Sequence, residues 1–91
     1  MVWAVNVLIR PGAGPNPLVV VKGLEAAAGP SSGSGAAIRD DGSVGSVDVS
    51  WYRDSEDAAT KVRAVLEVAA HELPDVELEM FGPFRIDDGD A

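Results

Sequence analysis

The chain has 91 residues, of which 7 are basic and 15 acidic, so its formal net charge is −8. Hydrophobic residues make up 46% and charged residues 24%, which is ordinary for a folded domain, and no cysteine is present to form disulfides or thiolate metal sites. We therefore expect a single cytoplasmic domain over residues 1–86, followed by an acidic, disordered tail at residues 87–91.

The negative charge also limits the classes of partner. An acidic surface repels the phosphates of nucleic acids and the head groups of anionic lipids. The longest apolar run, Leu18–Val21, is far shorter than the roughly 20 residues that span a bilayer, and no secretory signal is recognisable. We expect neither nucleic acid nor membrane as a partner. The abundance of alanine, valine, glycine and aspartate is typical of a bacterium with high GC content.

Apolar residues alternate over residues 2–9, which predicts a β-strand. One face of this strand carries Trp3, Val5, Val7 and Ile9 and is expected to be buried, whereas the other carries Val2, Ala4, Asn6 and Leu8. A loop rich in glycine and proline follows over residues 10–17.

Residues 18–28 have two competing interpretations. Asn16 followed by Pro17 is typical of a helix start, and Leu18, Val21, Leu24 and Ala28 recur at helical spacing. The three valines at 19–21 favour a strand over residues 18–22 instead. The alanine-rich stretch at 24–28 leads us to favour the helix, ending at Gly29 and Pro30.

The middle of the chain predicts a hairpin. Residues 31–35 are expected to form a flexible loop, and residues 36–39 a short strand. An Asp-Gly turn at residues 41–42 then leads into a strand over residues 44–52. Its buried face carries Val47, Val49 and Trp51.

The second helix begins at Asp54 or Ser55 and is expected to end at Pro74. Its buried stripe consists of Ala59, Val62, Leu66, Ala69 and Leu73, broadened by Ala58 and Val65. A last strand follows, with Val76, Leu78 and Met80 inward, a bulge or bend at Gly82-Pro83, and a resumed strand over residues 84–86.

The order strand, helix, strand, strand, helix, strand is that of the ferredoxin-like α+β fold, βαββαβ. Right-handed crossovers give a four-stranded antiparallel sheet in the order 4-1-3-2, with both helices on one face. In this arrangement Trp3, Trp51 and Phe84 are expected to form an aromatic cluster on the helix side.

The opposite face of the sheet has no helix over it, and its residues are half polar or acidic and half apolar. Apolar residues on a central strand are hard to explain as purely solvated, so we predict a surface that binds a protein partner or a second copy, unless an exposed strand edge does so. The predicted partner-binding residues are Ala4, Asn6, Leu8, Asp48, Ser50, Tyr52, Glu77, Glu79 and Phe81.

An alternative hypothesis is a small-anion-binding enzyme or sensor. Its site would combine Arg10 with Gly12, Gly14 and Asn16, in a turn that lacks a complete phosphate-loop motif. A further alternative is an acidic decoy for a DNA-binding protein.

We find no motif for a cofactor, a metal or a catalytic residue. The single histidine, His71, falls in the last turn of a predicted helix, where a positive charge complements the helix dipole. The leading hypothesis is therefore a small acidic, non-catalytic interaction module.

Overall fold

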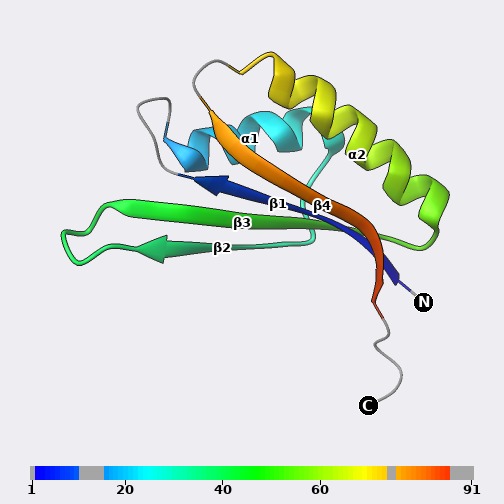
Figure 1. Ribbon diagram of the computed structural model, residues 1–91, viewed down its shortest axis with the longest axis horizontal. Helices are drawn as coiled ribbons and strands as arrows, with labels where there is room; N and C mark the ends of the chain where they lie inside the picture. Colours follow the sequence, from blue (N-terminus) through cyan, green and yellow to red (C-terminus); the bar gives the residue numbers. More distant parts are fainter. Residues whose placement is uncertain (1, 11–15, 74–75, 87–91) are drawn as a thin grey trace.

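The computed structural model describes residues 2–10, 16–73 and 76–86. Four strands and two helices alternate along the chain in the order βαββαβ (Figure 1). The elements are β1 (Val2–Arg10), α1 (Pro17–Ala28), β2 (Gly33–Ile38), β3 (Val44–Arg53), α2 (Glu56–His71) and β4 (Glu77–Ile86). The expected acidic tail at residues 87–91, the Gly12–Gly14 turn and Pro74 lie outside the described residues.

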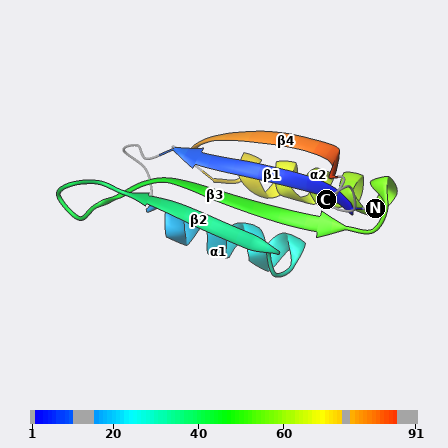
Figure 2. The same ribbon diagram turned by 90° about the horizontal axis from the view of Figure 1, so that it is seen from below.

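The strands form one antiparallel sheet in the order β2-β3-β1-β4, which confirms the predicted ferredoxin-like topology. Both helices cover the same face of the sheet, and the view from below shows the opposite face in front of them (Figures 1 and 2). No helix in the described parts of the chain is long and apolar enough to cross a membrane.

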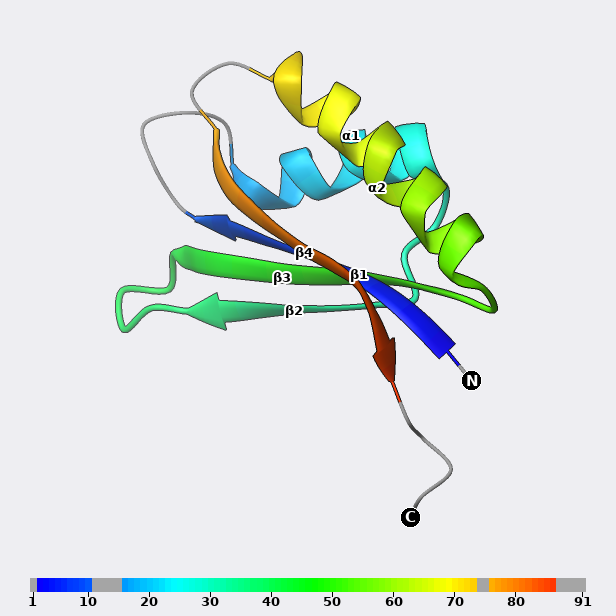
Figure 3. The same ribbon diagram turned by 45° about the vertical axis from the view of Figure 1, so that its right-hand side comes forward.

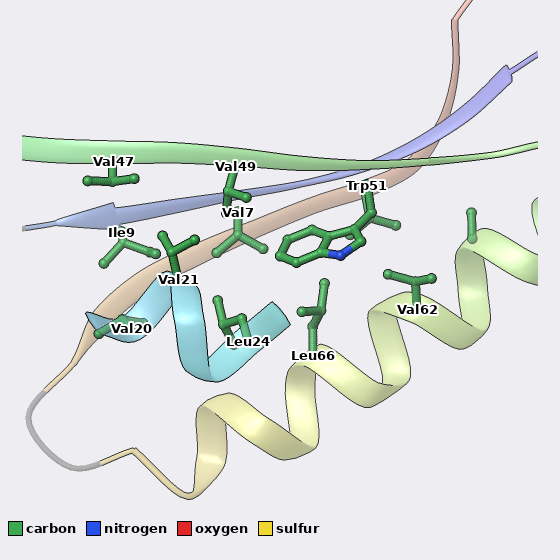
Figure 4. Close-up of a cluster of buried hydrophobic side chains, with 12 residues drawn as sticks. Val7, Ile9, Val20, Val21, Leu24, Val47, Val49, Trp51, Val62 and Leu66 are labelled. Carbon is green, nitrogen blue, oxygen red and sulfur yellow. The ribbon is translucent and has the colours of Figure 1, made fainter. Parts of the chain in front are cut away.

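The core lies between the sheet and the two helices. The alternation in β1 buries Val5, Val7 and Ile9, as predicted, and Trp51 from β3 is completely buried among them. Figure 4 shows its indole ring between the sheet valines and the leucines of the two helices, Leu24 and Leu66. Trp3 is partly buried and packs against this cluster, so both tryptophans lie on the helix side as expected.

Trp51 also makes a polar contact within this core. Its indole Nε1–H donates a hydrogen bond to the carbonyl oxygen of Gly29 at 3.0 Å. Gly29 is the C-cap of α1, with a positive φ of 91°. The hydrogen bond therefore ties the end of the first helix to the middle of the sheet.

Residues 17–28 form a helix, so the alternative strand over residues 18–22 is wrong. The Asn16 side chain accepts a hydrogen bond from the Leu18 N–H at 2.8 Å and satisfies a free amide of the first turn. Of the residues at helical spacing, Val21 and Leu24 are buried, whereas Leu18 is 47% exposed and Val20 lies in the core. The local start signals and tertiary burial outweigh the β-propensity of the three valines.

Ser55 caps α2, and its hydroxyl accepts a hydrogen bond from the Ala58 N–H. Ala59, Val62 and Leu66 are buried, and Ala69 and Leu73 pack against the core, as predicted. The broadening of the stripe to Val65 is wrong, since this side chain is 40% exposed.

The hairpin between β2 and β3 turns where predicted, with Gly42 at a positive φ of 88°. The Asp41 carboxylate accepts hydrogen bonds from the hydroxyl and the backbone N–H of Ser43, and these lower the pKa of Asp41.

The predicted start of β2 is wrong, because residues 33–35, expected in a loop, pair with β3. Backbone pairing needs no particular side chain, so this glycine- and serine-rich segment carries no strand signal of its own.

We expect Trp51→Phe to lower the free energy of unfolding by about 2–3 kcal/mol, because it leaves a cavity and removes the indole hydrogen bond. Chemical denaturation followed by far-UV circular dichroism would measure this change. Trp3→Phe is the matched control and should cost less than about 1 kcal/mol, since Trp3 is only partly buried. Equal losses in the two variants would contradict the central role of Trp51.

The connection from α1 to β2 is held by Glu25, whose carboxylate accepts the Ser31 backbone N–H at 2.9 Å. This hydrogen bond lowers the pKa of Glu25 in the folded state below its usual value of 4.5. The contribution of this hydrogen bond to the stability of the fold is therefore fully present above the usual pKa of 4.5, and it is lost as the pH falls through the lowered pKa of Glu25.

We therefore expect Glu25→Gln to be less stable than wild type at pH 7, with the difference shrinking as the pH falls below 4.5. Thermal unfolding at several pH values between 7 and 2.5 would show this. Glu72→Gln removes the same charge from an exposed position and serves as the control. If the difference in stability between Glu25→Gln and wild type is the same at pH 7 and at pH 2.5, the proposed role of the Glu25 carboxylate is wrong.

Candidate functional site

The sheet face opposite the helices is the candidate site, and we call it the open face. The register of β1 places Ala4 opposite Tyr52, Asn6 opposite Ser50, and Leu8 opposite Asp48. On the other side of β1, Asn6 lies opposite Phe81, Leu8 opposite Glu79, and Arg10 opposite Glu77. Cross-strand partners share a face of the sheet, so all nine predicted residues lie together on the open face.

One half of the open face is aromatic. Tyr52, Phe81 and Phe84 are 46%, 45% and 42% exposed and come from the strands on either side of β1. Ala4 lies between Tyr52 and Phe84 and is only 1% exposed, although we expected it to be accessible. A small side chain between two large neighbours is shielded from solvent, so the rings, rather than Ala4, form the accessible surface.

Phe84 is the main correction to the predicted site. We expected it on the helix side beside the two tryptophans, but it pairs with Ala4 and lies on the open face. The pairing of β1 with β4 shifts between Ala4 and Asn6, which leaves an extra residue in β4 at Gly82-Pro83. One extra residue moves all later side chains to the opposite face. The bulge was predicted from these two residues, but its effect on the face of Phe84 was missed.

The bend of β4 accompanies this shift. Figure 3 shows the second half of β4 turning away from the line of its first half. Gly82 has a φ of 101°, in the left-handed region, and a Cβ at this position would collide with the carbonyl oxygen of Ala4. Only glycine fits this close backbone approach without strain.

The other half of the open face is charged and polar. The Arg10 guanidinium forms an ion pair with Glu79, with 2.5 Å between Nη2 and Oε1, and both side chains are half exposed. The Asn6 side chain donates hydrogen bonds to Asp48 at 2.7 Å and to Ser50 at 2.8 Å. These contacts hold the polar side chains in one arrangement on the sheet.

The charges of this half do not balance. Arg10 contributes +1, and Asp48, Glu77 and Glu79 together contribute −3, so the sum on the open face is −2. We find no group of three potential metal-ligating residues in residues 2–10, 16–73 and 76–86. The open face therefore consists of an aromatic area beside an acidic one.

The structure describes two of the four residues predicted for the anion-binding site, Arg10 and Asn16. Arg10 is engaged by Glu79, and the Asn16 side chain caps α1. Gly12 and Gly14 are not among the described residues. His71 lies in the last turn of α2, as predicted.

Neither a protein-family model nor a curated protein matches the sequence. Two solved structures have a similar overall arrangement, both from Agrobacterium tumefaciens. Protein Atu4242 is 18% identical, with a TM-score of 0.43 and coverage of 97% of this chain and 98% of that chain. The NIPSNAP-family protein Atu5224 is 14% identical, with a TM-score of 0.40 and coverage of 94% and 97%.

We expect Gly82→Ala to destabilise the fold by about 2 kcal/mol or more, because an added Cβ meets the Ala4 carbonyl and alanine disfavours this φ. Urea denaturation would measure the loss. Gly35→Ala is the control, since a Cβ there has no neighbour within 4 Å, and its effect should stay within about 1 kcal/mol. If Gly82→Ala is as stable as Gly35→Ala, the close approach at the bulge is not required.

Proposed function

We propose that this protein is a small non-catalytic interaction module whose open face binds another protein. The observation that carries this proposal is the aromatic half of that face, where three large side chains are each more than two-fifths exposed on the side of the sheet opposite the two described helices. Exposed aromatic groups that lie together are uncommon on surfaces that contact only water, and they are frequent anchors of protein interfaces.

The size of the open face supports the same conclusion. Three strands of 9 or 10 residues are roughly 30 Å long, the six-residue β2 is roughly 20 Å long, and each strand is about 4.8 Å wide. The footprint, on the order of 500 Å², is more than half of one side of a standard protein interface, which is about 800 Å². The three aromatic residues lie on paired strands of the sheet, so their backbone is already ordered before a partner binds, which reduces the entropy lost on binding.

Charge indicates which partner fits. The acidic half carries a net charge of −2 and adjoins the aromatic half, so the complementary surface has an apolar patch beside lysine or arginine side chains. A second copy of this chain complements the open face poorly, because it brings the same acidic area and only 7 basic residues among 91. We therefore propose a heterologous partner with a basic rim.

Capture from an extract of the native host would test this proposal. We expect a partner that binds wild type, dissociates as the salt concentration rises, and is lost with Phe81→Ser and Tyr52→Ser. The matched control is Val68→Ser, which removes an apolar side chain that is 64% exposed on α2. This variant should bind like wild type.

The captured partner would then be purified and titrated into labelled protein. The proposal expects amide NMR shifts in β1, β3 and β4 at the residues of the open face. It would be wrong if Phe81→Ser and Tyr52→Ser retained every partner of the wild type, or if the shifts mapped to α1 and α2 instead.

A further inference from the structure

The two edges of the sheet differ in how they are protected. At the β4 edge, the Arg63 guanidinium of α2 donates a hydrogen bond to the carbonyl oxygen of Gly82, and Pro83 lacks a backbone donor. The bulge at these residues bends the strand further. A bulge, a proline and a covering side chain are the usual means by which a sheet edge avoids pairing with another chain.

The β2 edge has no proline and no such hydrogen bond from a helix among the described residues, and the register shift between Ala36 and Ile38 places its extra residue in β3 rather than in β2. All six of its residues, Gly-Ser-Gly-Ala-Ala-Ile over Gly33–Ile38, are exposed. The strand contains no charged residue and no proline, and four of its side chains are no larger than a methyl group. Within the described residues, β2 pairs with β3 alone, so its outer edge is open to another strand.

The register identifies the backbone groups at this edge. The Ser50 carbonyl and the Tyr52 N–H both bond to Ser32, so even-numbered residues of β3 point their backbone groups toward β2. Their partners Gly33 and Gly35 then point back toward β3. Farther along, the Arg39 N–H also points toward β3 and donates to Ser43.

The alternate residues therefore point outward. Ser34, Ala36 and Ile38 each present one N–H and one C=O away from the sheet. We propose that a second copy of this chain pairs with this edge, so that β2 of each copy runs antiparallel to β2 of the other. The twofold axis passes beside Ala36, which places Ser34 of one copy opposite Ile38 of the other.

A second copy fits this edge better than a flexible peptide does. Both strands are already extended in the folded monomer, so pairing them costs less conformational entropy than ordering a free segment. The pairing brings together segments without charge, although each molecule carries −8 overall. The exposed Ile38, at 64%, gains cover from the facing strand.

The difference between the edges also limits the assembly. In the dimer both β2 edges are paired, and only the two obstructed β4 edges remain at the ends of the joined sheet. Further copies therefore cannot add by strand pairing, and the assembly stops at two copies instead of forming a fibre. The open face stays free in this dimer. The inference therefore does not rest on the proposed function, and either one can fail alone.

Sedimentation velocity of the full chain over a range of concentrations would test the dimer. We expect wild type to have twice the monomer mass at high concentration. Ala36→Glu should sediment as a monomer, because the two glutamates would lie directly opposite each other at the twofold axis. Thr60→Glu adds the same charge at an exposed position of α2, and this control should remain dimeric.

Amide hydrogen exchange would locate the contact. In the dimer, the N–H groups of Ser34, Ala36 and Ile38 should be protected in wild type and exchange rapidly in Ala36→Glu. The N–H groups of Gly33 and Gly35 bond within the sheet and should stay protected in both, which shows that the variant is folded.

Two results would overturn the inference. One is a wild type that stays monomeric while the N–H groups of Ser34, Ala36 and Ile38 exchange freely. The other is a dimer that survives Ala36→Glu but dissociates with Phe81→Ser. That second result would place the contact between copies on the open face, and it would also contradict the heterologous partner proposed for that face.

Discussion

The buried indole of Trp51 is the contact on which the rest of this small structure depends. It fills the space between the sheet and both helices, and its one polar group is satisfied by the carbonyl that ends α1. Right-handed crossovers place both helices on one face of the sheet, and the indole holds the end of α1 against that face. The opposite face of the sheet has no helix over it in the described part of the chain, and the proposed partner site lies there.

The bulge in β4 decides what the uncovered face displays. Without the extra residue at Gly82-Pro83, Phe84 would point toward the helices and the open face would lose one of its three exposed rings. The close approach of Gly82 to the Ala4 carbonyl makes this geometry specific, because a larger residue would collide with the neighbouring strand. A short irregularity of the backbone therefore adds the third ring to the aromatic half, which lies beside the polar network of Asn6 and the Arg10–Glu79 ion pair.

The two proposed surfaces use different physical forces. The open face offers apolar area and charge, so it selects a partner by side-chain chemistry. The outer edge of β2 offers backbone hydrogen bonds and almost no side chains, so it favours a partner that is already extended and similarly bare. If the β2 edges of two copies pair, their open faces lie on one continuous sheet, and a partner with two equivalent sites would bind with increased avidity.

The sequence by itself determined the order of the elements, the strand order and the face of β1 that is buried. Period-two and helical spacing, the Asn16 cap and the Asp-Gly turn are local signals, and right-handed crossovers leave one compact topology. Only the tertiary structure decided that Val20 rather than Leu18 faces the sheet, that β2 begins at Gly33, and that Phe84 joins Tyr52 and Phe81 on the open face. Each of these depends on contacts between segments distant in the chain: the angle at which α1 meets the sheet, the pairing offered by β3, and the register shift against β1. Local residue patterns do not encode such contacts, because a shift of one residue in register changes which face a side chain occupies while leaving the sequence pattern unchanged.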